Sequence, residues 1–370
     1  MNKKLLVLAL SSFLLVGCNT KSGGTSSNSS EETPTSSEDV NAAYQVTEAE
    51  WNAAINLEGK NFTLGSYEAG VETPAVVIEK METYKYHIEM QMNTSSRWKA
   101  WVQPTTNPEI FLCHVSDLTD VTNIVPQYMT KKDVNTASPM GGMPLDFGIV
   151  DSMKQYSYNN TATFDETGHF YATTYMFGNP ESPTEQKARV YFENKKLVEL
   201  EILGEKDGQL QVLSDIKFSA YGSTAITFPT DTVAAFTDQL QGHYFAFNSS
   251  SNSTVAGYFA DSIILFKLPQ YDFYSMPPAL KYYAEVVVTN QAAQQEMDVK
   301  SVYAEYAQEN NAFSLIITAV DNYDGTTSTF NVPLTGSLNS NQITVNFPAA
   351  ASNEFFKVNE DVTVTFQVVA

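Results

Sequence analysis

Alternating hydrophobic and polar residues dominate the chain and predict a protein built mainly from β-strands. In residues 84–92, Tyr, Ile and Met share one face of the pattern, and Lys, His, Glu and Gln share the other. Residues 362–368 alternate in the same way, with Val and Phe against Thr and Gln. Successive side chains of a strand point to opposite faces, so a period of two predicts a strand. Further strands are predicted at residues 61–64, 98–102, 110–115, 170–177, 190–192, 197–202, 212–218, 225–228, 243–247, 262–268, 282–289, 299–306, 313–320, 328–332 and 343–347.

Few segments carry the signals of a helix. Thr47 and Glu50 form a capping box ahead of a predicted helix at residues 48–58, and Gly59 follows its end. A second helix is predicted at residues 145–156, where apolar residues recur at helical spacing. The fold class is therefore mainly β with few helices, an α+β protein.

The chain after Pro229 predicts a separate C-terminal domain at residues 231–370. Thr230 can cap a short helix, because apolar residues follow at positions 233, 236 and 240. Regularly spaced strands then indicate an all-β sandwich or a small barrel. The segment LQGHYFAF, residues 240–247, resembles the first strand of lipocalin-like domains, which often carries a Gly-x-aromatic step.

The first residues have the pattern of a targeting signal. Lys3 and Lys4 precede an apolar run at residues 5–16, which is too short to span a bilayer stably and indicates a signal peptide. The run ends in Leu-Val-Gly-Cys and resembles the lipobox of bacterial lipoproteins. That resemblance implies that residues 1–18 are a lipoprotein signal and lipobox, and that Cys18 is acylated and becomes the first mature residue. An ordinary secretory signal that contains a cysteine is the alternative.

The next two segments are predicted to be a tether and a first domain. Residues 19–43 are rich in Ser and Thr without periodic apolar positions, which predicts a disordered tether. Over residues 45–232, the order of elements and the segments VYFENKKLVELEI and LSDIKFSAYGSTAITFP resemble the LolA-like and LppX-type lipoprotein fold. The resemblance implies that residues 44–230 form a curved antiparallel sheet, a half-barrel wrapped on helices around an apolar cavity. Residues 84–110 are unusually rich in Met and Trp, and an insertion-like stretch follows, so the size of the cavity is not implied.

One face of the predicted sheet is a candidate site for an apolar ligand. Met and aromatic side chains together make an adaptable surface for acyl chains and similar molecules. A filled core is the alternative, because alternating strands normally pack one face inward. The candidate residues are Tyr84, Tyr86, Ile88, Met90, Met92, Trp98, Val102 and Leu112.

Composition and charge exclude several classes of function. The chain has 370 residues, with 21 Lys and Arg against 42 Asp and Glu, a net charge of −21. Phosphate backbones would repel such a surface, so no nucleic-acid partner is expected. Loss of Lys3 and Lys4 with the signal would lower the net charge from −21 to −23. Two cysteines rule out a disulfide framework, and four scattered histidines argue against a histidine-based zinc site.

No motif of a cofactor, a metal site or a catalytic centre stands out. No nucleotide-binding glycine loop, H-E-x-x-H motif or G-x-S-x-G motif occurs in a plausible context. Residues 321–325 fit a hairpin turn better than a calcium loop. His87 is predicted to lie on a solvated face, and Cys113 to be a buried free thiol. We therefore expect no cofactor, no metal and no enzymatic activity.

The sequence predicts a lipid-anchored protein on the extracytoplasmic face of the cell membrane. Its expected partners are the membrane, through the acyl anchor on Cys18, and a lipid or other apolar ligand bound or carried in the first domain. A structural or interaction lipoprotein that binds a partner protein or glycan through its β-rich domains is the alternative. A hydrolase would require two facing carboxylates or a His–carboxylate pair.

Overall fold

A computed structural model describes most of the chain after residue 45. It describes residues 46–117, 120–136, 145–146, 148, 153–154, 156, 158, 162–164, 170–176, 186–206, 209–272 and 279–369. The expected signal peptide, Cys18, the tether and half of the residues of the predicted helix at residues 145–156 lie outside this part. The described residues are mainly β-strand, which confirms the predicted fold class.

Contacts divide the chain into two compact units, and each is a body by itself. The first unit contains Met1–Val102, Ser116–Ile124 and Thr136–Phe228. The second unit contains Gln103–Val115, Val125–Asn135 and Pro229–Ala370. The domain boundaries expected from the sequence stay predictions.

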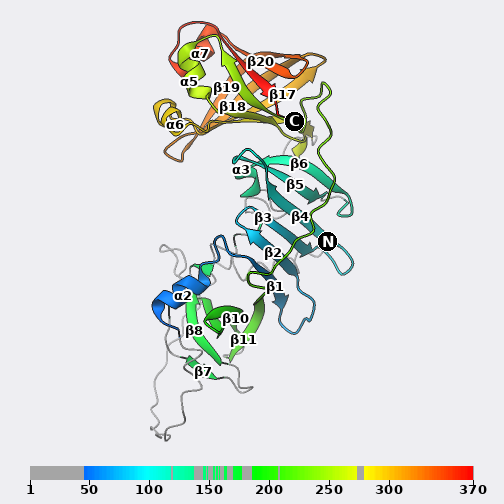
Figure 1. Cartoon of the computed structure of the whole chain (residues 1–370), viewed down its shortest axis with the longest axis vertical. Coiled ribbons are helices and arrows are strands. Elements are labelled where there is room, and N and C mark those ends of the chain that lie inside the picture. Colours follow the sequence, from blue (N-terminus) through cyan, green and yellow to red (C-terminus); the bar gives the residue numbers. More distant parts are fainter. Residues whose placement is uncertain are drawn as a thin grey trace, which may run out of the picture. The chain divides into compact units, whose positions relative to one another are not determined.

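Nine strands of the first unit form a curved antiparallel sheet (Figure 1). They are β1 (Phe62–Glu68), β2 (Val76–Glu82), β3 (Lys85–Gln91), β4 (Arg97–Pro104), β7 (Ala162–Phe164), β8 (Phe170–Met176), β9 (Gln186–Glu193), β10 (Lys196–Lys206) and β11 (Gln209–Ser219). Their order is β4-β3-β2-β1-β11-β10-β9-β8-β7. Strand β1 therefore pairs with the late strand β11, for example Leu64 with Phe218, so residues far apart in the sequence close the middle of the sheet.

The helix α2 (Glu48–Ile55) is placed by its capping box and by one large side chain. The Thr47 side chain accepts from the Glu50 N–H, and the Glu50 carboxylate accepts from the Thr47 N–H, as predicted. Trp51 is fully buried, lies 5.1 Å from the ring of Phe192, and donates its indole N–H to the carbonyl of Tyr156. The helix ends at Ile55, earlier than predicted.

The second unit contains a closed, eight-stranded antiparallel barrel, which decides between the predicted sandwich and barrel. Its strands follow the chain around the barrel, and β12 closes it by pairing with β21. They are β12 (Tyr244–Ser250), β13 (Ile263–Phe266), β16 (Tyr283–Val287), β17 (Ser301–Glu309), β18 (Ala312–Asp321), β19 (Thr327–Asn339), β20 (Gln342–Phe347) and β21 (Val362–Val368). The hairpin of β14 (Gln270–Asp272) and β15 (Ala279–Lys281) lies between β13 and β16.

Short helices close one end of the barrel. Neighbouring strands run in opposite directions, so every second connection lies at the same end. The connections after β12, β16 and β20 are α5 (Ser253–Phe259), α6 (Gln291–Met297) and α7 (Ala349–Phe356), and they lie together at one end (Figure 1). The other end has tight two-residue turns, with positive φ at Asn310 and Ser340.

The segment before β12 is irregular, so the predicted helix after Thr230 is wrong. Side chains of the second unit form hydrogen bonds with the backbone groups of this segment. The Gln308 amide donates to the carbonyl of Asp238 and accepts from the N–H of Leu240, and a ring nitrogen of His243 lies 2.9 Å from the carbonyl oxygen of Ala234. Leu240 is fully buried in the barrel core.

A second part of this unit is the hairpin of β5 (Ile110–Ser116) and β6 (Ile124–Thr130), which is followed by α3 (Lys131–Val134). Ile110 and Tyr128 pack on side chains that point outward from the barrel, among them Tyr244 and Leu265. The rings of Tyr128 and Tyr244 meet edge to face with centroids 4.8 Å apart. The outside of the barrel is therefore partly covered.

Other sequence-based predictions also need correction. His87 is not solvated: it is 8% exposed, stacks on Trp101 at 4.4 Å, and bonds to the Glu79 carboxylate at 2.8 Å. Neighbouring polar side chains cover it, which an alternation pattern cannot show. Residues 225–228 form no strand. Cys113 is a buried free thiol, as predicted, and burial raises its pKa.

Candidate functional site

The interior of the barrel contains a chamber lined only by apolar side chains. Residues that alternate inward along β16–β20, such as Ala284, Leu315 and Val345, form its wall. The volume of the chamber, measured as the space available to the centre of a water-sized sphere, is about 40 Å³. An apolar cavity of this kind stays dry. The lining residues are Phe259, Ile264, Ala284, Val286, Val288, Met297, Val299, Val302, Ala304, Leu315, Ile317, Leu334, Val345, Phe347, Phe355, Phe356 and Phe366.

Aromatic rings close the chamber toward the helices. The ring centroid of Phe356 on α7 lies 5.6 Å from that of Phe259 on α5 and 5.1 Å from that of Phe347 on β20. These pairs meet edge to face, an arrangement that stabilises aromatic contacts beyond the burial of area. The rings are thus a packed layer between the chamber and the helix-capped end.

A second, wider space lies on the outer side of that layer, and we call it the vestibule. Its volume on the same measure is about 190 Å³. It shares Met297, Val299, Phe355 and Phe356 with the chamber, so the same side chains separate the two spaces. The remaining lining residues are Tyr258, Glu296, Asp298, Val320, Asn322, Ser328, Phe330, Glu354 and Lys357.

The rim of the vestibule is polar and ordered by hydrogen bonds. The Tyr258 hydroxyl donates to the Glu296 carboxylate at 2.9 Å, and burial followed by the nearby carboxylate raises the pKa of Tyr258. Asp298 adopts the left-handed conformation at the end of α6 and accepts from the Tyr323 N–H at 2.9 Å. The vestibule is therefore mainly polar, with apolar side chains on the wall that it shares with the chamber.

The structure places the predicted ligand residues of the first unit on neighbouring strands. Tyr86 pairs with Val102 and Met90 with Trp98, and Ile88 lies between them on β3. All five are at most 2% exposed. The Trp98 indole donates to the carbonyl of Ser116 at 3.0 Å.

The other three predicted ligand residues are less enclosed. Tyr84 and Met92 flank β3 and are half-buried, and so is Leu112 on β5. Leu112 belongs to the second unit by its contacts. The pockets described above are lined by other residues, and ligand binding by the predicted set stays a prediction.

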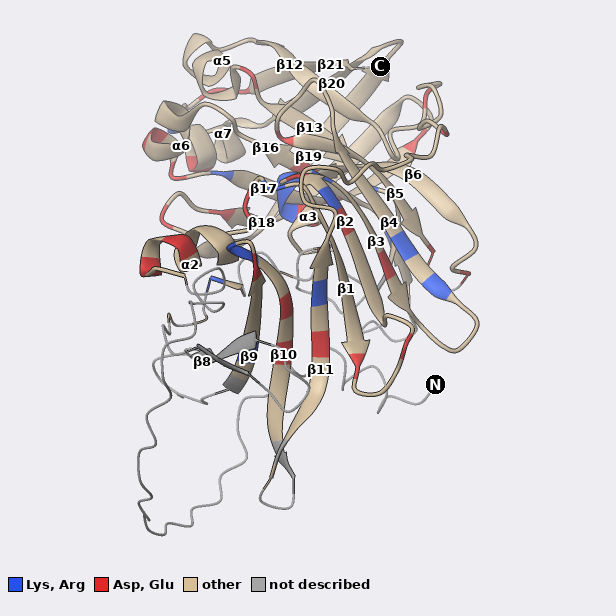
Figure 2. Cartoon of the chain, turned by 60° about the horizontal axis from the view of Figure 1, so that its bottom comes forward, with Lys and Arg blue, Asp and Glu red and all other residues tan. Residues whose placement is uncertain are grey.

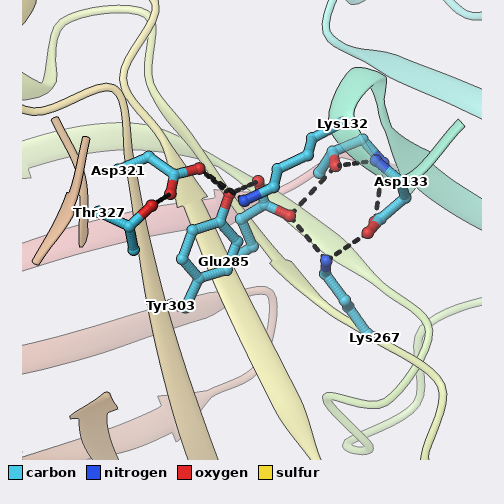
Figure 3. Close-up of polar contacts among 8 residues, drawn as sticks. Lys132, Asp133, Lys267, Glu285, Tyr303, Asp321 and Thr327 are labelled. Carbon is cyan, nitrogen blue, oxygen red and sulfur yellow. Dashed lines mark hydrogen bonds and ion pairs between the residues drawn. The ribbon is translucent and has the colours of Figure 1, made fainter. Parts of the chain in front are cut away.

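A group of bonded charges in the second unit joins α3 to the outside of the barrel (Figure 3). Glu285 is fully buried, and its carboxylate lies 2.7 Å from the Lys267 ammonium. Lys267 also contacts Asp133 at 2.6 Å. Glu285 accepts in addition from the hydroxyl of Thr130 at 3.1 Å, and the Tyr303 hydroxyl oxygen lies 3.2 Å from its other carboxylate oxygen.

Burial and charge act against each other in this network. Burial raises the pKa of Glu285, and the Lys267 ammonium only partly offsets this. Burial acts to lower the pKa of Lys267, but Glu285 and Asp133 outweigh it and the pKa of Lys267 is raised. Both carboxylates are bonded to protein groups, which is the arrangement of a structural network rather than of a catalytic acid and base.

A neighbouring carboxylate extends the network. Asp321 accepts from Lys132 at 2.6 Å, from the Tyr303 hydroxyl at 2.8 Å and from Thr327 at 2.9 Å. The Lys132 ammonium also lies 4.2 Å from the centroid of the Tyr303 ring. Among the described residues no group of three or more His, Cys, Asp or Glu side chains could hold a metal ion.

The vestibule and the network leave no signal in the sequence, for different reasons. Alternation along β17, β18 and β20 did mark the inward side chains of the chamber. The helices that close it are too short to show a clear periodicity, although Asn252 and Asn290 are recognisable as their N-caps. The network joins Asp133 to Lys267 across a large distance in sequence, and no local pattern reports such a contact.

Comparison with known proteins does not identify the chain. No protein-family model and no curated protein matches it. Similar solved structures include MucB in complex with MucA(peri), at 10% identity over 87% of this chain and 94% of that one, with a TM-score of 0.21. The Pseudomonas aeruginosa MucA/MucB complex has 11% identity over the same shares and a TM-score of 0.23. A DUF3598 family protein from Nostoc punctiforme, of unknown function, has 10% identity over 87% and 100%, with a TM-score of 0.18. Scores this low carry no argument about function.

Proposed function

We propose that this is a lipid-anchored extracytoplasmic protein that binds a small apolar ligand in its C-terminal barrel, without catalysis. The observation that carries the proposal is the all-apolar chamber and its shared wall with the vestibule. Ligand pockets usually measure about 300–1,000 Å³. A chamber of about 40 Å³ and a vestibule of about 190 Å³ therefore suit a single ring or a short hydrocarbon chain rather than a whole lipid.

The ligand would enter between α6 and α7. Phe355 is half-buried and lines both spaces, so a change of its rotamer joins them. The apolar part of the ligand then lies against Phe356 and Met297, and any polar group remains at the rim near Lys357 and Glu296. Burial of apolar surface at about 25 cal/mol per Å² supplies the affinity.

Binding of benzyl alcohol and short n-alkanols, followed by the shift in melting temperature, tests the proposal. Val345→Phe fills the chamber and should abolish the shift. Asn346→Phe is the matched control, since the neighbouring side chain is exposed on the same strand. Phe355→Ala widens the connection and should strengthen binding, which a folding defect cannot imitate. Equal shifts in all of these proteins would contradict the proposal.

The anchor is proposed from the sequence and is tested separately. The lipobox-like ending at Cys18 supports it. Two acyl chains anchor a protein stably where one does not. Metabolic labelling with a tritiated fatty acid should mark the wild type and leave Cys18→Ala unmarked. No helix within the described residues is long and apolar enough to cross a membrane.

A second candidate function is recognition of a neutral glycan or a protein partner by one side of the barrel. The neighbouring strands β19, β20, β21 and β12 contain no Asp, Glu, Lys or Arg, and their ribbons show none in Figure 2. Exposed Ser, Thr and Asn side chains cover this side and bond to one another, as Ser249 does with Thr365 at 2.7 Å. Binding to soluble neutral polysaccharides that is lost in Thr344→Glu would support this function.

A further inference from the structure

A groove in the first unit gathers lysines in a chain that is otherwise strongly acidic. Its volume is about 290 Å³, and three of its lining residues are Lys60, Lys195 and Lys196. Glu50 is the single acidic residue among the lining residues. The whole chain has twice as many acidic as basic residues, 42 against 21, so the sign of the charge is reversed at this place. The other lining residues are Ala53, Ala54, Leu197 and Tyr221.

The lysines are held in position by the local fold. Lys195 is the second residue of the tight turn between β9 and β10, where Asn194 and Lys195 both have positive φ. Such a turn fixes the hairpin and presents consecutive side chains at its tip. Lys60 donates to the carbonyl of Ala53, at the carbonyl end of α2, where the helix dipole favours a positive charge.

The floor of the groove is apolar and rigid. Leu197 is fully buried, and the Tyr221 hydroxyl donates to its carbonyl at 2.8 Å, which fixes the ring. The Lys196 ammonium lies 5.7 Å from the centroid of that ring. The groove therefore combines ammonium groups at its edge with a hydrocarbon surface beneath them.

Glu50 already shows how an anion is held at this place. Its carboxylate lies 2.6 Å from the Lys195 ammonium. The hydrogen bond from Lys195, followed by those from Thr47, lowers the pKa of Glu50 to about 2. Each ammonium carries three N–H donors, so donors of Lys195 remain for a second anion beside Glu50.

We propose that this groove binds a small acid with an apolar body. A carboxylate or phosphate group would lie between the lysine ammonium groups, and the hydrocarbon part would lie against Tyr221 and Leu197. Neither a bare anion nor a neutral hydrocarbon would use both surfaces. This site is separate from the barrel and does not depend on the function proposed for it.

Calorimetry on the full chain in phosphatidylcholine nanodiscs tests the proposal, with phenyl phosphate as the probe. Inorganic phosphate supplies only the charge and should bind at least about tenfold more weakly than phenyl phosphate. The double variant Lys195→Gln/Lys196→Gln should lose about tenfold in affinity for phenyl phosphate. Lys217→Gln, an exposed lysine on β11 outside the groove, is the matched control and should bind as the wild type does.

A gain-of-binding variant separates the proposal from damage to the fold. Glu50→Gln removes the competing carboxylate, and Gln still completes a capping box. Its affinity for phenyl phosphate should rise by about threefold. Competition by nanodiscs that contain phosphatidic acid would identify a lipid headgroup as the source of the acid, and absence of competition a free acid. If the double variant and Glu50→Gln both bind like the wild type, the proposal is overturned.

Discussion

At the scale of single residues, the Lys267 ammonium is the centre of the charge network in the second unit. It contacts Glu285 at 2.7 Å and Asp133 at 2.6 Å. Removal of one partner of a buried pair leaves a charge without compensation, which costs about 3–5 kcal/mol. We therefore expect Lys267→Met to lower the free energy of unfolding by about that amount in urea denaturation.

Two further variants decide whether that loss reflects the buried charge. Lys267→Met/Glu285→Met removes both charges and should recover part of the loss, because a well-packed apolar pair replaces an ionic one. Lys281→Met breaks a more exposed pair with Glu305 and should cost at most about 1 kcal/mol. Equal losses for Lys267→Met and Lys281→Met would refute the structural role of the network.

The lowered pKa of Asp321 predicts how the stability of the protein depends on pH. Burial acts to raise its pKa, but hydrogen bonds from Lys132, Tyr303 and Thr327 outweigh it and the pKa lies below the ordinary value of 3.8. A lowered pKa means that the carboxylate stabilises the fold above pH 3.8, and that this contribution is lost as the pH falls through the folded-state pKa. Asp321→Asn should therefore melt below the wild type at pH 7, and the two melting temperatures should converge as the pH falls below 3.8. Glu309→Gln, which removes an exposed carboxylate at the end of β17, is the control. A difference in melting temperature between Asp321→Asn and the wild type that stays constant with pH would contradict the assignment.

At the scale of elements, Gly336 is a residue that the packing of β19 against β18 requires. Glycine is common in turns, but Gly336 lies inside β19 opposite Phe313. A Cβ at Gly336 would overlap the Phe313 ring, so the glycine is required by a close approach rather than by a turn. Gly336→Ala should destabilise the protein by about 1–3 kcal/mol, measured by urea denaturation.

Gly257 supplies the comparison for that prediction. It lies within α5, where a Cβ would meet no atom within 4 Å. Gly257→Ala should be neutral or stabilising by up to about 1 kcal/mol, because alanine favours the helix. Phe313→Leu/Gly336→Ala should restore part of the stability that Gly336→Ala loses. A harmless Gly336→Ala would mean that β19 and β18 pack differently.

The same scale shows what the sequence could predict. Each of the eight barrel strands was expected near its observed place, and β21 was expected at its observed residues, because its alternation is uninterrupted. Strand β2 was missed because Lys80 interrupts its apolar face; the side chain is nevertheless buried, 2.7 Å from Asp146. Local patterns report alternation and caps, whereas the chamber and vestibule depend on which distant strands become neighbours.

At the scale of the whole molecule, charge is distributed unevenly over a strongly acidic chain. The strands β12 and β19–β21 carry no charged side chain, whereas the net charge of the protein is −21. Acidic groups therefore concentrate on the rest of the surface, and the lysine groove is a local exception to them. A body of this charge is repelled by anionic lipid headgroups, and the repulsion decays over a Debye length of about 8 Å at physiological salt.

This distribution predicts that only the acyl anchor holds the protein to a membrane. A chain that starts at Asn19 and lacks acylation should stay in the supernatant when vesicles rich in phosphatidylserine are sedimented, at low salt and at physiological salt alike. Phosphatidylcholine vesicles are the control, and the acylated wild type should sediment with both. Repulsion weakens as salt screens it, so any residual binding should increase with salt. Strong binding at low salt that salt removes would instead reveal a basic membrane-binding surface and would contradict anchoring by the lipid alone.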